Sequence, residues 1–100
     1  MEKDHLTTGV GLFEVFSLIN TAEEAKNFLT DLCTPAEIKA FKERWNVCQL
    51  LNEKKYSYRE ISKLTGASLT TIGRVARFLN EENYGGYKTM LEKRSSLRKK

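Results

Sequence analysis

The sequence has few of the residues that interrupt or cross-link a helical chain. Its 100 residues include one proline, two cysteines and one histidine. No stretch alternates Val, Ile and Thr with polar residues, as the strands of a half-exposed sheet do. No apolar run approaches the roughly 20 residues of a membrane-spanning helix, and no signal peptide is recognisable. The sequence therefore predicts one all-α domain over residues 1–100, in a cytoplasmic protein without membrane contact.

The cysteines and the histidine do not indicate a metal or catalytic site. Cys33 and Cys48 lie fifteen positions apart, and His5 lies in a polar start, so the spacing of a zinc site is missing. No nucleophile–base pair or carboxylate pair is placed by a motif. We therefore expect no catalytic residue, no metal and no cofactor, and we expect both cysteines to be reduced core thiols.

Positive charge gathers in the second half of the chain. Residues 54–80 contain six basic residues and one acid, and residues 86–100 again contain six basic residues and one acid. The first 25 residues contain five acids, with Lys3 as their one Lys or Arg. This asymmetry is typical of a surface for an anionic partner, although a solvated face has the same composition.

Six helices are indicated by apolar residues at spacings of three and four. Several helix starts carry their own signal, such as Thr21 before two acids, Thr34-Pro35 before Glu37, and Ser57 before Glu60. The long third helix has a stripe of Ile38, Phe41, Trp45, Cys48 and Leu51. The predicted helices span 8–19, 22–32, 35–53, 58–65, 68–80 and 87–97.

Residues 58–80 have the pattern of a helix-turn-helix. Gly66 supplies the left-handed conformation that a tight turn needs. Ile61, Ser62 and Ala67 suit the close contact between the helices, and the inner positions of the second helix are Ile72, Val75, Phe78 and Leu79. Its outer face is polar and short-sided, with arginines behind, as suits a helix in the major groove. The predicted DNA-binding residues are Arg59, Lys63, Ser68, Leu69, Thr70, Thr71, Gly73, Arg74 and Arg77.

These residues are assigned two kinds of contact. Thr70, Thr71 and Arg74 are expected to confer sequence specificity, and Arg59 and Lys63 are placed for the flanking phosphates. An arginine such as Arg74 can bind either guanine or phosphate, so a phosphate contact of Arg74 also stays open. Helix pairs of this kind also occur as purely structural elements of all-α proteins, and that alternative stays open.

Four motifs follow one another along the chain: the run 32–37 (LCTPAE), then Arg44, the run 58–61 (YREI) and the run 66–74 (GASLTTIGR). Together they resemble the tryptophan (Trp) repressor family, in particular its uncharacterised Trp-repressor-like branch in bacteria. The resemblance covers about residues 32–97. It implies a six-helix fold in an intertwined homodimer that binds a palindromic operator. Residues 8–53 would form the dimerisation core, 58–80 the DNA-binding helix-turn-helix, and 87–97 the C-terminal helix.

The resemblance also identifies an effector pocket that is vestigial or remodelled. In relatives that bind tryptophan, residues equivalent to Thr34, Arg44 and Arg74 belong to the ligand pocket, and all three are present. Val75 and Phe78 depart from the Gly and the Ser that leave room for the ligand. Because overfilling a packed site is costly, we expect that tryptophan does not bind. Another small-molecule effector stays open.

Three functions can be weighed against these residues. The first is a sequence-specific regulator, more specifically a homodimeric repressor whose partners are double-stranded DNA and a second copy of the chain. The second is a homodimeric protein-interaction module that keeps the fold without binding DNA. An enzyme is the least favoured, because no motif supplies the chemistry.

Overall fold

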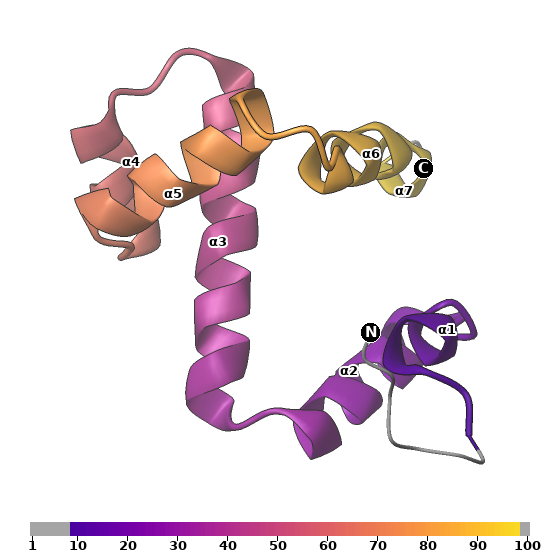
Figure 1. The fold of residues 1–100 in the computed structure, drawn as a ribbon. Helices are drawn as coiled ribbons and strands as arrows, with labels where there is room; N and C mark the ends of the chain where they lie inside the picture. Colours follow the sequence, from indigo (N-terminus) through magenta and orange to yellow (C-terminus); the bar gives the residue numbers. More distant parts are fainter. Residues whose placement is uncertain (1–8, 99–100) are drawn as a thin grey trace. The chain divides into compact units, whose positions relative to one another are not determined.

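The computed structural model describes residues 9–98, and every regular element in that range is a helix (Figure 1). Two compact units, 1–35 and 36–100, are described separately below. None of the described helices is long and apolar enough to cross a membrane. The elements are α1 (Leu12–Phe16), α2 (Ala22–Leu32), α3 (Pro35–Glu53), α4 (Tyr58–Thr65), α5 (Leu69–Asn80), α6 (Gly86–Lys93) and α7 (Ser95–Arg98).

The first unit contains α1 and α2 and has no core of its own among its described residues. Thr21 caps α2 as predicted, because its Oγ1 accepts a hydrogen bond of 3.0 Å from the backbone N–H of Glu24. The rings of Phe16 and Phe28 meet edge to face, with centroids 5.5 Å apart. Neither helix contains a buried residue, and Phe13 is 86% exposed. The apolar side chains of this unit are therefore left largely open in the single chain.

The predicted first helix, 8–19, is too long. In the described residues α1 begins at Leu12, after Gly11 in an extended conformation, and ends at Phe16. The Ser17 hydroxyl donates a 2.6 Å hydrogen bond to the backbone carbonyl of Glu14. Such a side chain competes for the helix carbonyls and favours termination. Residue 8 lies outside the described residues.

The second unit is built on the C-terminal half of α3. Val47 and Cys48 are fully buried there, whereas Phe41, a residue of the predicted stripe, is 45% exposed in the single chain. Val47 lies outside the predicted stripe. Apolar spacing alone does not show where along a long helix the partner elements pack.

The connection from α4 to α5 matches its predicted signals closely. The Ser57 Oγ accepts from the N–H of Glu60 at 3.1 Å, and the Ser57 N–H donates to the Glu60 carboxylate at 2.8 Å, which completes a capping box. Gly66 ends α4 with φ +83°, in the left-handed region. α4 and α5 lie in contact on either side of this turn (Figure 1).

A small hydrophobic core joins α3, α4, α5 and α6. α5 contributes three residues to it at helical spacing, and partly buried aromatic and leucine side chains pack around the outside. Burial also raises the pKa of the Cys48 thiol to about 11, so it stays protonated at neutral pH. The buried residues are Val47, Cys48, Ile61, Ala67, Ile72, Val75, Leu79 and Leu91.

The predicted last helix, 87–97, is divided at Arg94 into α6 and α7. The hydroxyls of Ser95 and Ser96 donate to the backbone carbonyls of Glu92 and Lys93, at 2.8 and 3.0 Å. These local bonds compete with a continuous helix. Arg94 itself reaches back to α3, where its guanidinium donates to the Gln49 side chain at 2.8 Å.

Two glycines of the second unit are expected to respond oppositely to substitution by alanine. Gly66→Ala places a Cβ at positive φ and should lower the free energy of unfolding by about 1–2 kcal/mol. Gly73→Ala adds a Cβ inside a helix with nothing within 4 Å, and should raise it by about 0.5–1 kcal/mol. Urea denaturation at one fixed protein concentration measures both changes. A shift of the same sign in both variants would contradict the assigned backbone conformations.

Candidate nucleic-acid interface

The rotation of α5 is set by its buried side, and this decides which residues face outward. Ile72 and Val75 are fully buried, as predicted, and Leu79 is 6% exposed. The exposure of each remaining residue of α5 is therefore set by its angular position around the helix. The sequence-predicted residues Ser68, Leu69, Thr70, Arg74 and Arg77 are exposed, and Thr71 and Gly73 are half-buried.

The N-terminus of α5 is held by a local hydrogen-bond network. The Ser68 Oγ accepts from the N–H of Thr71 at 3.0 Å, and the two side-chain oxygens lie 3.1 Å apart. In the preceding turn, the hydroxyl of Ser62 donates to the carbonyl of Ala67 at 2.7 Å. The N–H of Ala67 donates to the Thr65 hydroxyl at 3.1 Å. These bonds fix the first turn of α5 relative to α4.

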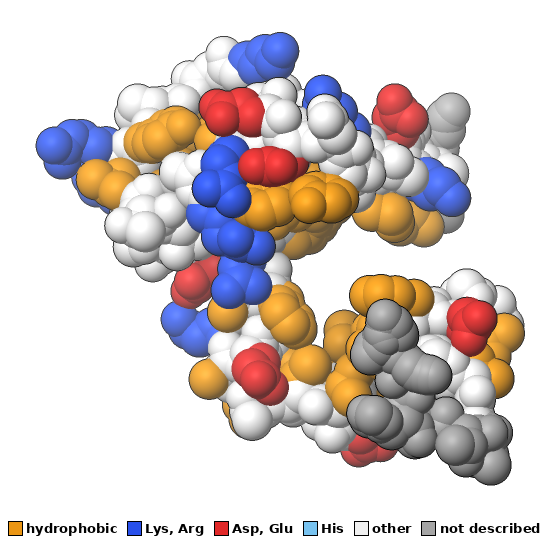
Figure 2. Space-filling view, in the orientation of Figure 1, with side chains coloured by type: hydrophobic (Ala, Val, Ile, Leu, Met, Phe, Trp, Pro, Cys, Tyr) orange, Lys and Arg blue, Asp and Glu red, His pale blue; other side chains and the backbone are white. Residues whose placement is uncertain are grey.

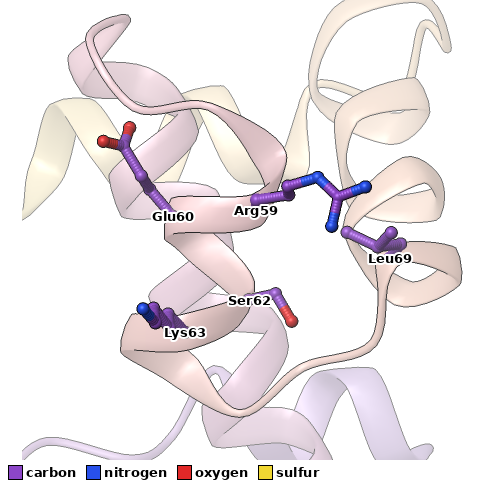
Figure 3. Close-up of a pocket in the computed structure, with 5 residues that line it drawn as sticks. All are labelled: Arg59, Glu60, Ser62, Lys63 and Leu69. Carbon is purple, nitrogen blue, oxygen red and sulfur yellow. The ribbon is translucent and has the colours of Figure 1, made fainter.

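A groove lies between α4 and the beginning of α5. Arg59, Glu60, Ser62, Lys63 and Leu69 line it. In Figure 3 the Arg59 guanidinium points toward Leu69, whereas Glu60 points away from it. Arg59 and Lys63 form no ion pair with another described residue. Both cations are thus exposed and available to an anion at the edge of α5.

The C-terminal half of α5 carries an aromatic–arginine cluster, defined as Arg74, Arg77, Phe78 and Tyr84. The Arg74 and Arg77 guanidinium carbons lie over the Phe78 ring, 4.3 and 4.8 Å from its centroid. The Tyr84 ring stacks on Phe78, with centroids 6.2 Å apart and an angle of 19° between the rings. Figure 2 shows a run of Lys and Arg side chains beside hydrophobic ones on this unit.

The structure of this region corrects one sequence prediction and shows two further residues, Glu82 and Tyr84, that the sequence did not indicate. Phe78 was predicted to be an inner residue, but it is only half-buried, because the inward direction is taken by Val75 and Leu79. Glu82 pairs with Arg77 across 3.2 Å. Glu82 and Tyr84 follow the end of α5, where helical periodicity no longer predicts side-chain directions.

The residues of the predicted effector pocket have different environments. Thr34 is exposed and directly precedes α3 in the first unit. Val75 is part of the core of the second unit. The positive charges of Arg44 and Arg74 both act on the Tyr87 hydroxyl and oppose the rise in its pKa, which is caused chiefly by burial. Two of the expected arginines therefore influence the same hydroxyl group, on α6.

Comparison with known proteins gives a consistent result. The profile of the family described as "Trp repressor protein" matches residues 10–95. The chain is 40% identical over 72 residues to the uncharacterized protein YerC of Bacillus subtilis (strain 168), covering 72% of this chain and 68% of that protein. It is 42% identical over 64 residues to a Trp operon repressor homolog of Aliivibrio salmonicida (strain LFI1238), covering 61% of this chain and 59% of that protein.

A solved structure supports the same grouping. A TrpR-like protein from Eubacterium eligens ATCC 27750 superposes with a TM-score of 0.75 at 38% identity, and the match covers 82% of each chain. The chain is thus an all-helical protein with the Trp-repressor-like fold, as the sequence predicted. It belongs to the Trp repressor family. Members of this family are regulators rather than enzymes. The chain therefore belongs to the class of DNA-binding regulators.

The Glu82 carboxylate is expected to weaken DNA binding. It holds Arg77 across 3.2 Å and adds negative charge beside the predicted interface. Glu82→Gln should therefore tighten binding to duplex DNA by about twofold to fivefold at low salt. A mobility-shift titration measures the affinity.

The matched control for this substitution is Glu43→Gln, which removes the Lys39–Glu43 ion pair on α3. It changes the net charge equally, and we expect little effect on affinity. Equal tightening in both variants would show that only the net charge matters.

Proposed function

We propose that the protein is a sequence-specific transcriptional repressor that binds double-stranded DNA as a homodimer at a palindromic operator. α5 is the recognition helix, and it enters the major groove with its N-terminal half. The observation that carries the proposal is the polar, exposed outer face of α5 together with two exposed cations on α4, Arg59 and Lys63, which form no ion pair with another described residue. As a DNA-binding regulator the protein acts in the cytoplasm.

The two kinds of contact are divided along the α4–α5 pair. Thr70 is exposed at the start of α5, where a hydroxyl and a methyl group suit base edges. The remaining proposed contacts at this end of α5 are made by Ser68, Leu69, Thr71 and Gly73. Gly73 has no side chain, and the space where its Cβ would lie is open. The proposed phosphate contacts come from Arg59 and Lys63, with Arg74 and Arg77 behind the base-reading end.

The homodimer is supported by the missing core of the first unit. Its described helices have no buried residue, and the exposed apolar side chains include Phe13 and Leu18, at 86% and 67% exposed. Phe41 on α3 is exposed as well. So much open apolar surface is typical of an interface, and a second copy of the chain is the partner that the family resemblance implies. Residues 8–53 are the proposed dimerisation core, 58–80 the helix-turn-helix, and 87–97 a C-terminal helical segment.

Free tryptophan is not the proposed effector. Val75 is fully buried and packs in the core, which supports its role as a filler where tryptophan-binding relatives have glycine. Phe78 places its ring beside Arg74, at a position where tryptophan-binding relatives have a small Ser. Thr34 and Arg44 then remain from a vestigial or remodelled pocket.

The second candidate is a homodimeric protein-interaction module that does not bind DNA. The exposed apolar residues of the first unit favour it, because they suit a protein partner as well as a second copy. The two candidates differ in their response to duplex DNA.

Selection of bound duplexes from a random pool should yield a palindromic site, with half-sites about one helical turn apart. The logarithm of the binding constant for that site should fall linearly with the logarithm of the salt concentration. A pool without enrichment at low salt would favour the interaction module, and an enriched site without two-fold symmetry would contradict the dimer.

Two substitutions separate sequence reading from phosphate binding on the selected site. Thr70→Ala should reduce the preference for the selected site over random duplex by about fivefold to tenfold, with little change in salt dependence. Lys63→Ala should weaken binding to both duplexes alike and reduce the salt slope by about one contact. Mobility shifts at several salt concentrations measure both quantities. Identical behaviour of the two variants would contradict the division of contacts.

Calorimetric titration with L-tryptophan should show no saturable heat, because the bulky Val75 and Phe78 stand where tryptophan-binding relatives have a Gly and a Ser that leave room for the ligand. DNA affinity should accordingly be the same with and without tryptophan. Saturable binding with one site per chain would contradict the filled pocket, whatever the result with DNA.

A further inference from the structure

The geometry points to Phe78 as a positioning residue that fixes the directions of Arg74 and Arg77 toward DNA. The inference rests on the proposed function and adds a residue that contacts the arginines rather than the nucleic acid. Its role is to hold two long, flexible cations in place before DNA arrives.

The contacts of Phe78 carry the argument. Both guanidinium groups lie within the distance at which a cation is attracted to the face of an aromatic ring, at 4.3 and 4.8 Å. Arg74 lies one helical turn before Phe78, on the same face, and Arg77 is its chain neighbour. One ring thus engages both arginines of α5.

The ring itself is held by a second aromatic ring. Phe78 is half-buried and is followed in the chain by the buried Leu79. Tyr84, in the segment after α5, stacks on it at an angle of 19°. Tyr84 is 82% exposed, so the stack covers the outer side of the cluster without enclosing it. A ring restrained in this way is a firmer support for the arginines than an exposed aliphatic chain.

The arginines keep their capacity for phosphate while they lie on the ring. A guanidinium group that stacks by its plane presents its N–H donors at its edges, where they are free for bidentate contact with an oxygen pair. Arg74 has no ion pair with another described residue, and Arg77 is 55% exposed in its side chain. Stacking therefore restricts the motion of both side chains and leaves the donors of Arg74 exposed, whereas the Nε of Arg77 is also paired with Glu82.

The consequence for binding is a lower entropic cost. A long side chain that is already ordered in the free protein loses less freedom when it contacts phosphate. Removing the ring should leave the number of phosphate contacts unchanged, because both charges remain, but should make each contact less favourable. A steady salt slope with reduced affinity is the signature of this role, and a merely charged residue does not give it.

The test compares Phe78→Leu with Phe78→Tyr in the full-length protein. Phe78→Leu keeps an apolar side chain but has no aromatic face, and Phe78→Tyr retains the ring. The probe is a duplex carrying the selected site, with random duplex beside it. Phe78→Leu should bind about fivefold to tenfold more weakly with the wild-type salt slope, and Phe78→Tyr should bind within about twofold of wild type.

Nuclear magnetic resonance of the free protein provides a readout that does not involve DNA. The side-chain protons of Arg74 and Arg77 should be shifted upfield by the ring in wild type and in Phe78→Tyr, and the shift should disappear in Phe78→Leu. Thermal unfolding of each variant shows whether it is folded, and the tyrosine variant keeps the test decisive if the leucine variant is not.

The outcomes separate the inference from the function beneath it. Wild-type affinity in Phe78→Leu, a weakened Phe78→Tyr that retains the ring shift, or a salt slope reduced as in Arg77→Ala would each overturn the positioning role while DNA binding stands. Absence of salt-dependent DNA binding by wild type would overturn the proposed function and this inference together.

Discussion

The structure of the second unit depends on the burial of one side of α5 against the C-terminal half of α3. Ile72, Val75 and Leu79 pack with Val47 and Cys48, and this contact sets the rotation of α5 about its own axis. Side-chain directions around a helix are fixed relative to one another, so the residues that face the core determine which residues face outward. The proposed recognition face of α5 is thus set by the apolar residues on its opposite side.

The same contact explains why the turn before α5 is so closely specified. A core of so few residues tolerates little error in the approach of α4 to α5. Gly66 makes the reversal at positive φ, and the hydroxyl groups of Ser62 and Thr65 bond across the turn. Ser57 and Ser68 cap the two helices at their N-termini. Backbone and side-chain bonds therefore restrict the helix pair where hydrophobic packing alone is limited.

Local signals made most of the fold predictable from the sequence. The bounds of α2, α3 and α4 follow from Thr21, Pro35, Ser57 and Gly66, because each acts on neighbouring backbone groups. The prediction was wrong where serine hydroxyls end or divide a helix, near Ser17 and Ser95, since such competition is not encoded in apolar spacing.

The candidate site was less predictable than the fold. The exposed residues of α5 follow from its periodicity, but the aromatic–arginine cluster does not. It depends on Tyr84 stacking on Phe78 after the helix has ended, and on Phe78 being only half-buried. Such contacts depend on the conformation of the irregular segment after α5. Neither residue spacing nor composition predicts that conformation.

The burial of Cys48 has a practical consequence for spectroscopy. With a pKa of about 11, its thiol is about one ten-thousandth ionised at pH 7, and no side of it faces solvent. Cys33 is only half-buried and is a free thiol. In the single chain, maleimide dyes at neutral pH should thus attach to Cys33 rather than to Cys48. A single fluorophore in the first unit then reports on that unit, while the unit that carries α5 keeps its native side chains.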